Sequence, residues 1–205
     1  MRKWIVGLLF TAGIILIISP LMKYQLIDFS ASKVSMDEYS AEELQQNNER
    51  KATFDYEAIT PPTMTNVLKT TVKMDNPAVI GTITIPDVDI ELPILKGTTN
   101  ANLLIGAATM RENQQMGKGN YPLAGHHTRS KEQFFGRVPE LKTGADIYLS
   151  DKKNKYHYKV TENKIISETE ADVINDTAEN KITLITCDVP TETSKRVIVQ
   201  GVLVE

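Results

Sequence analysis

Residues 78–95 read AVIGTITIPDVDIELPIL, two β-branched stretches separated by Pro86-Asp87. Apolar and polar residues alternate along both halves, which is the period-two pattern of a strand with one buried face. Proline followed by aspartate marks a turn. We therefore predict strands over Ala78–Ile85 and Val88–Leu95, joined by a tight connection.

Working outward toward the C-terminus, similar short stretches recur. They cover Tyr121–Ala124, Asp146–Ser150, Lys155–Val160, Lys164–Ser167, Ile182–Thr186 and Val197–Val204. Asn100–Met110 is richer in alanine and leucine and is a candidate helix, as is the stretch around Gln133–Phe135. Eight or so short strands with one or two short helices predict a mainly β domain, a closed or nearly closed barrel over residues 76–205.

Residues 24–75, which precede this domain in the sequence, are predicted to form a stalk. Two capping-box patterns begin at Ser35 and Ser40, so a short helix is expected to run to about Lys51. Pro61-Pro62 excludes regular structure beside it. A flexible spacer is one interpretation. The alternative is a segment that packs on the domain, with residues 54–71 covering the active site and lowering its activity.

Residues 1–23 predict a cytoplasmic tip and a membrane anchor. Trp4–Met22 is uncharged and apolar, and as a helix it would measure about 28 Å, close to a bilayer core of about 30 Å. A cleaved signal peptide is disfavoured because no small-x-small site follows the run. Arg2 and Lys3 place the N-terminus in the cytoplasm. The chain is thus predicted to cross the cell membrane once, with its main domain extracellular.

Composition excludes several other classes. The 205-residue chain has a net charge of −3, so a nucleic-acid partner is not expected. Its one cysteine allows neither an intrachain disulfide nor a zinc site built on several thiolates.

That cysteine, Cys187, ends the apolar stretch Thr183–Cys187 and precedes a polar loop. A small buried packing residue is one interpretation; a nucleophile delivered to the rim of a barrel is the other. Arg196 opens the next predicted strand. If the two strands pair, the guanidinium can reach the surroundings of the thiol and donate to an oxyanion. A solvated arginine is the alternative.

The three histidines differ in their settings. His157 shares its strand face with lysines and is predicted to be exposed and structural. His126 and His127 follow Leu123–Gly125 at a strand end, and neighbours on a strand point to opposite faces, so one of them is expected to enter a given pocket. The same argument speaks against a metal site, and no metal ligands are predicted. Cysteine, histidine and arginine together supply a nucleophile, an acid/base and an oxyanion donor for acyl transfer.

These residues resemble the motifs of the sortase family. Leu123-Ala124-Gly125-His126 is similar to the family's histidine motif, Thr183–Cys187 resembles its T-L-x-T-C motif, and Arg196 follows as the family's arginine does. The resemblance covers about residues 76–205. It implies an eight-stranded barrel and a transpeptidase that cleaves a Leu-Pro-x-Thr-Gly signal between Thr and Gly through a Cys187 thioester.

The resemblance also implies roles and partners. His126 would be the acid/base and Arg196 the oxyanion donor, while Ala124, Thr186 and Ile198 match positions that bind substrate. The substrates would be surface proteins that carry the sorting signal. The acceptor would be an amine of a lipid-linked peptidoglycan precursor, so that the enzyme anchors surface proteins to the cell wall.

The chain looks like class A of that family, with one departure. Some class A members bind calcium through acids ahead of the histidine motif, whereas Glu112 is the only acid between Thr98 and Gly125. Arg111, Gln114 and Lys118 stand about where the carboxylates would be. Calcium needs several oxygen ligands, so we predict calcium independence, with a lysine pairing instead with an acid of residues 168–172.

Two other functions use the same features. A membrane-anchored cysteine peptidase would cleave without transfer, and it would need the same three residues. A non-enzymatic extracellular binding module would keep Cys187 as a packing residue, and its thiol would then react slowly.

Overall fold

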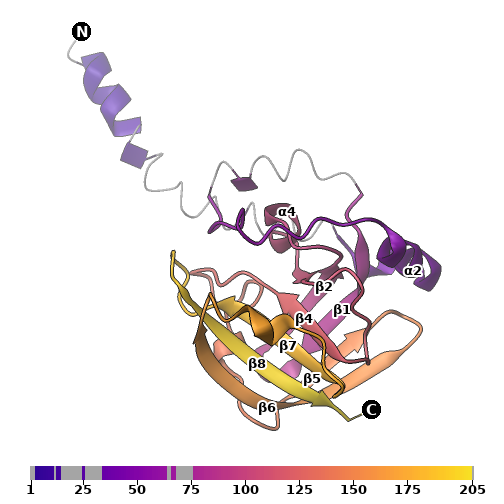
Figure 1. Ribbon diagram of the computed structural model, residues 1–205. Helices are drawn as coiled ribbons and strands as arrows, with labels where there is room; N and C mark the ends of the chain where they lie inside the picture. Colours follow the sequence, from indigo (N-terminus) through magenta and orange to yellow (C-terminus); the bar gives the residue numbers. More distant parts are fainter. Residues whose placement is uncertain are drawn as a thin grey trace.

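The computed structural model describes residues 3–11, 13–14, 25, 34–63, 66–67 and 76–204. Its strands are β1 (Val79–Ile85), β2 (Ile90–Leu95), β3 (Ala107–Thr109), β4 (Asn120–Ala124), β5 (Asp146–Ser150), β6 (Lys155–Ser167), β7 (Lys181–Cys187) and β8 (Lys195–Leu203). They close into a barrel in the order β1-β2-β3-β4-β7-β8-β6-β5 (Figure 1). The prediction of a mainly β chain with an eight-stranded barrel is confirmed.

The first two strands form the predicted hairpin, with Ile85 opposite Ile90. The predicted start of the second strand at Val88 is wrong. Pro86–Val88 form a turn of 3-10 helix, η2, and Asp89 adopts a left-handed backbone with φ of 51°. Proline fixes a helical φ at the first position of such a turn, which delays the strand to Ile90.

The core lies inside the barrel and is built from alternate residues of the strands. Its fully buried side chains include Ile83, Leu123, Leu149, Tyr158 and Leu184. Burying an aliphatic or aromatic side chain of this size contributes about 1.5–3 kcal/mol. The period-two pattern therefore stabilises the barrel and also decides which residues face outward.

The helix predicted over Asn100–Met110 is mostly wrong. Only α4 (Asn100–Leu103) is helical, with Thr99 Oγ1 accepting from the Asn102 N–H at its start. The chain then turns at Gly106, where a Cβ would lie 2.2 Å from the Pro93 carbonyl oxygen. Beyond it β3 pairs in parallel with β2, and this pairing outweighs the helix propensity of its alanines.

Two further boundaries differ from prediction. Gln133–Phe135 is not helical, because Phe134 has φ of 52° and forms a bridge with His127; a 3-10 helix, η3, follows at Val138–Glu140. The two strands predicted over residues 155–167 are one strand, β6, with a bulge after Val160. Bulges keep pairing continuous across a local irregularity.

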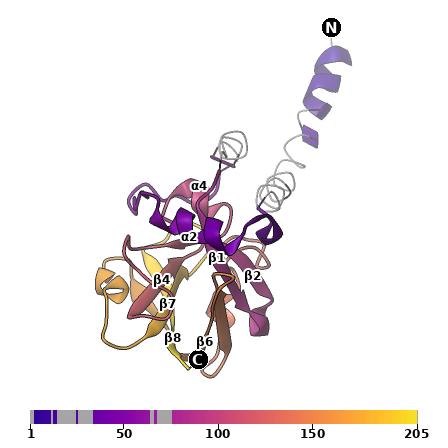
Figure 2. The same cartoon turned by 90° about the vertical axis from the view of Figure 1, so that its right-hand side faces the viewer.

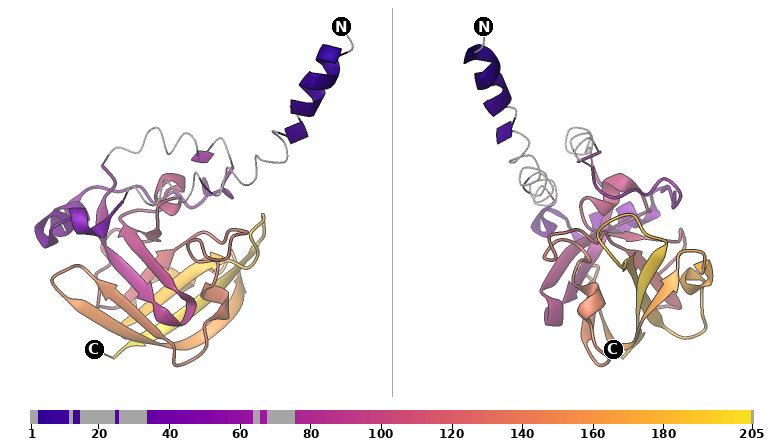
Figure 3. Two further views of the ribbon diagram at one scale, coloured as in Figure 1. Left: turned by 180° about the vertical axis from the view of Figure 1, so that it is seen from behind. Right: turned by 90° about the vertical axis from the view of Figure 1, so that its left-hand side faces the viewer.

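The predicted capping box at Ser40 is present, and it begins α2 (Ala41–Glu49). The box predicted at Ser35 precedes only a 3-10 turn, η1 (Met36–Glu38). α2 lies beside the start of β1 (Figures 2 and 3). Its Leu44 is 1% exposed, and Asn47 Nδ2 donates to the carbonyl of Val79 (2.9 Å).

The predicted membrane anchor lies partly outside the described residues. Residues 3–11 and 13–14 are helical, and residues 15–22 are not described. In the portion of the chain that is described, none of the helices has the length and apolar character needed to span a bilayer. The stalk of residues 24–75 is likewise described only in part, and its boundary with the barrel stays a prediction.

Candidate active site

The ends of β7 and β8 bring the single cysteine and an arginine side by side. Cys187 is the last residue of β7, and its cross-strand partner on β8 is Arg196. The N–H of Asp188 donates to the carbonyl of Lys195 (3.4 Å). This bond makes the cysteine and arginine a non-hydrogen-bonded pair, the type in which side chains approach more closely. The juxtaposition expected from a paired hairpin is therefore present.

Both of these side chains lie on the outer face of the barrel. Leu184 and Val197, on the same two strands, belong to the inner core, so residues an odd number of positions away face outward. Ile185 and Ile198 follow this rule and form a separate cluster with Ile166. The cysteine and the arginine stand at the end of that row.

We call this cluster the outer apolar cluster. Its members are the buried Ile166, Ile185 and Ile198 and the partly buried Met110, Val173 and Ile174. The last two belong to η4 (Ala171–Ile174), a short helix in the connection between β6 and β7. In Figure 1 this gold helix lies over β7 and β8. The cluster is apolar, lies beside the thiol and is covered by the loop that carries η4.

His126 reaches the same end of the barrel from β4. That strand runs parallel to β7, with Ala124 opposite Ile185, and Gly125 N–H donates to the Ile185 carbonyl (3.0 Å). A side chain at Gly125 would come within 2.4 Å of the Phe135 ring, so the close approach needs glycine. His126 itself is 7% exposed. Parallel strands end at the same edge, which brings the histidine to the edge that carries the cysteine.

The three predicted substrate-binding residues lie in different places. Ala124 is half-buried at the outward end of β4, next to Ile185. Ile198 is a fully buried member of the outer apolar cluster. Thr186, 3% exposed, has the opposite parity to Cys187, and its Oγ1 has no hydrogen-bond partner among the described residues. Ala124 and Ile198 thus lie near the thiol's face, whereas Thr186 faces the barrel interior.

His127, to which the sequence assigned no role, contacts the cysteine backbone. Its Nδ1 lies 2.8 Å from the carbonyl oxygen of Cys187. Its backbone bridges Phe134, so the residue joins the loop after β4 to the end of β7. The only sequence signal was its position next to His126, with the opposite side-chain direction.

Neighbouring groups shift the pKa of the Cys187 thiol in opposite directions. Burial raises the pKa of Cys187, Arg196 lowers it, and the acids Asp188 and Glu168 raise it further. The net direction is upward, so the resting group is mainly a thiol near neutral pH. An activated nucleophile here depends on a base and on the nearby guanidinium.

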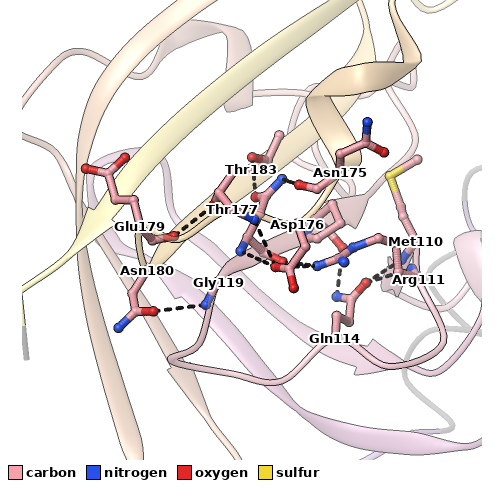
Figure 4. Close-up of polar contacts among 12 residues, drawn as sticks. Met110, Arg111, Gln114, Gly119, Asn175, Asp176, Thr177, Glu179, Asn180 and Thr183 are labelled. Carbon is pink, nitrogen blue, oxygen red and sulfur yellow. Dashed lines mark hydrogen bonds and ion pairs between the residues drawn. The ribbon is translucent and has the colours of Figure 1, made fainter.

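A buried asparagine fastens the loop that carries η4. Asn120 is 0% exposed, and its Nδ2 donates to the carbonyls of Val173 (2.8 Å) and Asn175 (2.9 Å). Its Oδ1 accepts from Thr183 Oγ1 (2.7 Å), which in turn accepts from Gln200 Nε2 (3.1 Å). Figure 4 shows part of this network, with Asn175 and Thr183 labelled. It connects β8, β7 and β4 to the wall of the outer apolar cluster.

The region where calcium-binding carboxylates were considered holds an ion pair instead. Arg111 NH2 lies 3.2 Å from Asp176 Oδ1 (Figure 4). Gln114 is buried, and its Oε1 accepts from the N–H groups of Met110 (3.0 Å) and Arg111 (2.8 Å). Lys118 makes no ion pair within the described residues. The cation of this ion pair is therefore Arg111 and not the expected lysine. Its acidic partner, Asp176, lies just beyond residues 168–172.

No metal cluster replaces that pair in the described part of the chain, where no three His, Cys, Asp or Glu side chains are grouped to hold an ion. Backbone N–H groups of Asn120 and Thr177, together with Arg111, lower the pKa of Asp176. Its carboxylate is thus already provided with donors. Calcium independence stays a prediction.

His157 lies apart from this site, on the β5–β6 pair. Its Nε2 is 2.6 Å from Asp146 Oδ1, and its ring stacks on Tyr148 with centroids 4.7 Å apart. The side chain is 22% exposed, and both contacts are structural.

A stretch of the predicted stalk lies against the barrel near the site. Phe54 bridges Thr98, and the Tyr56 hydroxyl donates to the carbonyl of Met110. Val67 is buried against Phe134. Of these contacts, that of Tyr56 reaches the outer apolar cluster at Met110, whereas Val67 belongs to a separate apolar cluster. The hypothesis that this stretch lowers activity is tested by deleting residues 24–71 and measuring the rate.

Known proteins resemble this chain in both sequence and fold. The Sortase domain family matches residues 83–204. The chain is 47% identical over 203 residues to Sortase A of Listeria monocytogenes, covering 99% of this chain and 91% of that one. It is 35% identical to Sortase A of Streptococcus agalactiae, covering 98% and 84%. The crystal structure of Listeria monocytogenes sortase A superposes with a TM-score of 0.62 at 55% identity, covering 62% of this chain and 88% of that chain.

Proposed function

This chain belongs to the sortase family, and from that premise we propose that it cleaves a Leu-Pro-x-Thr-Gly-type signal between Thr and Gly. It is a cysteine transpeptidase that anchors surface proteins. The proposal adds the signal, the residues and the acceptor: Cys187 as nucleophile, His126 as acid/base, Arg196 as oxyanion donor, and an amine of a lipid-linked peptidoglycan precursor.

One observation carries the assignment of residues. Cys187 and Arg196 are a cross-strand pair on the outer face of the barrel. His126 arrives at the same edge from a strand parallel to that of the cysteine. Nucleophile, proton carrier and cationic donor are thereby supplied by three strand ends that the barrel holds in register.

The first half-reaction forms a thioester. Cys187 Sγ attacks the Thr carbonyl carbon while its proton passes to His126. Arg196 donates hydrogen bonds to the oxygen that becomes negative. The C–N bond to Gly then breaks, and His126 gives its proton to the departing amine.

The second half-reaction restores the enzyme. The acceptor amine attacks the thioester carbon and loses a proton to His126. The C–S bond breaks, an amide forms, and the proton returns to the Cys187 sulfur. Because the raised pKa of Cys187 makes the thiolate a poorer leaving group than an ordinary one, Arg196 also serves this step by stabilising the negative sulfur.

The apolar side chains of the signal have candidate partners in the outer apolar cluster. We propose that the apolar Leu and Pro of the signal bind the outer apolar cluster, with Ala124 and Ile198 beside the peptide. Ile185 and Ile198 lie in a row that leads to Cys187, so a peptide bound along it would bring its following residues to the thiol. Thr186 would act by shaping the strand end.

We further propose that the enzyme needs no calcium and acts at the membrane. The Arg111–Asp176 ion pair, in the region where calcium-binding carboxylates were considered, supports the first part of this proposal. The uncharged run Trp4–Met22 after Arg2 and Lys3 supports a single-pass anchor with a cytoplasmic N-terminus and an extracellular barrel. Protease accessibility of the barrel on intact cells tests this orientation.

The test uses full-length protein in detergent with a quenched Leu-Pro-x-Thr-Gly peptide. Two acceptors are compared: hydroxylamine, whose hydroxamate product reports a thioester in a peptidase or a transpeptidase alike, and a peptide with a free amine, whose joined product reports transfer. The product is identified by mass. Cys187→Ala, His126→Ala and Arg196→Ala are compared with His157→Ala and Arg137→Ala, matched controls whose side chains pair with acids on other parts of the barrel.

A joined product that needs the first three residues and neither control establishes the proposal. Cleavage without a joined product would favour a peptidase. No reaction, with slow labelling of Cys187, would favour a packing role for the thiol.

A further inference from the structure

Glu168 stands where β6 ends and the loop bearing η4 begins. Its N–H donates to the carbonyl of Ser194 (2.8 Å), which ties this point to the start of β8. Its Oε2 accepts from Arg196 NH2 (2.8 Å). The side chains are 45% and 28% exposed, so the pair is at the mouth of the site and is not a buried structural element.

The guanidinium of Arg196 is held at three points. NH1 donates to the carbonyls of Thr193 (2.8 Å) and Lys195 (2.9 Å), and NH2 donates to Glu168. A guanidinium is planar and has five N–H groups. Three bonds fix its plane, and the other two N–H groups have no acceptor among the described residues.

The two contacts from Nη1 are both local, to carbonyls one and three residues before Arg196. Among the described residues, Glu168 alone bonds the guanidinium to a more distant part of the chain. Without it, the arginine would be oriented only by its own turn, and a long flexible side chain held by local contacts loses much of its orientation. Donors that are fixed in advance cost no reorganisation during the reaction.

We propose that Glu168 is a positioning residue, whose carboxylate holds Arg196 beside Cys187 so that its two remaining N–H groups serve the oxyanion. This inference rests on the proposed function, since it takes Arg196 as the donor. Glu168 also begins the loop that carries Val173 and Ile174 of the outer apolar cluster. Glu168 thus contacts Arg196 and also begins the loop that is proposed to face the substrate.

The charge of Glu168 has a second consequence that a merely structural residue would lack. It raises the pKa of Cys187, whereas Arg196 lowers it. Glu168→Gln keeps an oxygen acceptor for Arg196 and removes the negative charge. The thiol should therefore titrate at lower pH in this variant.

The test measures kcat and KM for peptide and hydroxylamine with the full-length chain. We expect Glu168→Ala to lower kcat about 10- to 100-fold with KM within about twofold, because a misplaced Arg196 loses the charge-assisted hydrogen bond that it would donate in the transition state. Glu168→Gln should recover part of that loss. The matched control is Glu162→Ala, because Glu162 is also 45% exposed and pairs with Lys164 (2.9 Å) on the same strand.

A double variant tests whether the effect passes through the arginine. Glu168→Ala should lower kcat little further in an Arg196→Ala background, because no guanidinium is present there to be positioned. The pH dependence of iodoacetamide labelling should show a lower thiol pKa in Glu168→Gln and no change in Glu162→Ala. Circular dichroism checks that each variant is folded.

Several outcomes would overturn the inference. These are an unchanged or higher kcat in Glu168→Ala, a full additional loss in the double variant, or an effect equal to that of the control. If the wild type forms no joined product, the proposed function itself fails. A working wild type with an indifferent Glu168 refutes only the positioning role.

Discussion

Replacing Asn120 by alanine should release the loop that walls the outer apolar cluster. The side chain is fully buried and makes three bonds of 2.7–2.9 Å, two of them to carbonyls of that loop. Alanine removes all three and changes no charge. The loop would then be held mainly at Asp176, which is 68% exposed and accepts from the backbone N–H of residue 120 (3.1 Å) and from Arg111 (3.2 Å).

The magnitude follows from the fate of each partner. A typical hydrogen bond contributes about 1 kcal/mol net, and a buried group left without a partner costs about 1–3 kcal/mol. The carbonyl of Val173 belongs to a half-buried residue and that of Asn175 to an exposed one, so both can reach water. Thr183 is fully buried but still accepts from Gln200. We expect a loss of about 3 kcal/mol in the free energy of unfolding.

The function should change through KM. A substrate that binds against η4 must first order the released loop, so part of the lost free energy reappears as weaker binding. About 1.4 kcal/mol corresponds to a factor of ten. KM should therefore rise about tenfold or more, while kcat at saturation falls less.

Asn163→Ala is the matched control for this prediction. Asn163 Nδ2 also donates to two carbonyls, those of Pro139 (3.1 Å) and Leu141 (2.8 Å), but on β6 away from the loop. It should lose about 1 kcal/mol with an unchanged KM. Urea unfolding and initial rates measure both variants. A KM for Asn120→Ala equal to that of the wild type, despite a loss of stability, would refute the argument that the asparagine holds the loop for substrate.

Three other predictions concern charge and pH. Arg196→Gln removes the cation that lowers the pKa of Cys187, so iodoacetamide labelling at pH 8 should slow about 3- to 10-fold; an unchanged rate would contradict this. Asp176→Asn should raise KM several-fold, and millimolar calcium should leave wild-type rates unchanged; activation by calcium would contradict our loop assignment. Burial raises the pKa of Tyr158 to about 12 and also raises that of Tyr121. The contribution of these two hydroxyls to the free energy of unfolding is therefore complete below about pH 10. It is lost as pH rises, by about 1.4 kcal/mol per pH unit and group. Urea midpoints at pH 9 and 11 check this, and equal midpoints would count against it.

The position of the proposed catalytic residues could be predicted because it depends on a local rule. Side chains alternate along a strand, and polar residues that end an apolar strand lie at the barrel rim. Cys187, Arg196 and His126 each occupy such an end, so their placement needed only the pairing of the strands. The same rule, applied to Thr186, would have placed it on the opposite face from the cysteine; the resemblance alone put it with the substrate.

The helix predicted over residues 100–110 failed for the opposite reason. Ala107 and Ala108 favour a helix by intrinsic propensity, yet they pair with β2 in the barrel core. No feature of residues 100–110 alone indicates that part of this stretch pairs with β2. Short alanine-rich segments are therefore where local preference is weakest against the sheet.

The contacts that hold the reactive groups are of this distant kind. Arg196 pairs with an acid 28 residues away, and the Cys187 carbonyl contacts a histidine 60 residues away. From the sequence, the arginine could have paired with any of several acids at the rim: Glu168, Glu170, Asp172, Asp188 or Glu192. Only the closure of β6 against β8 selects Glu168, because it brings Ser167 opposite Lys195. Strand periodicity determines which groups can react, and closure of the barrel determines how each is held, so substitutions at the holding residues should alter rates without removing any reactive atom.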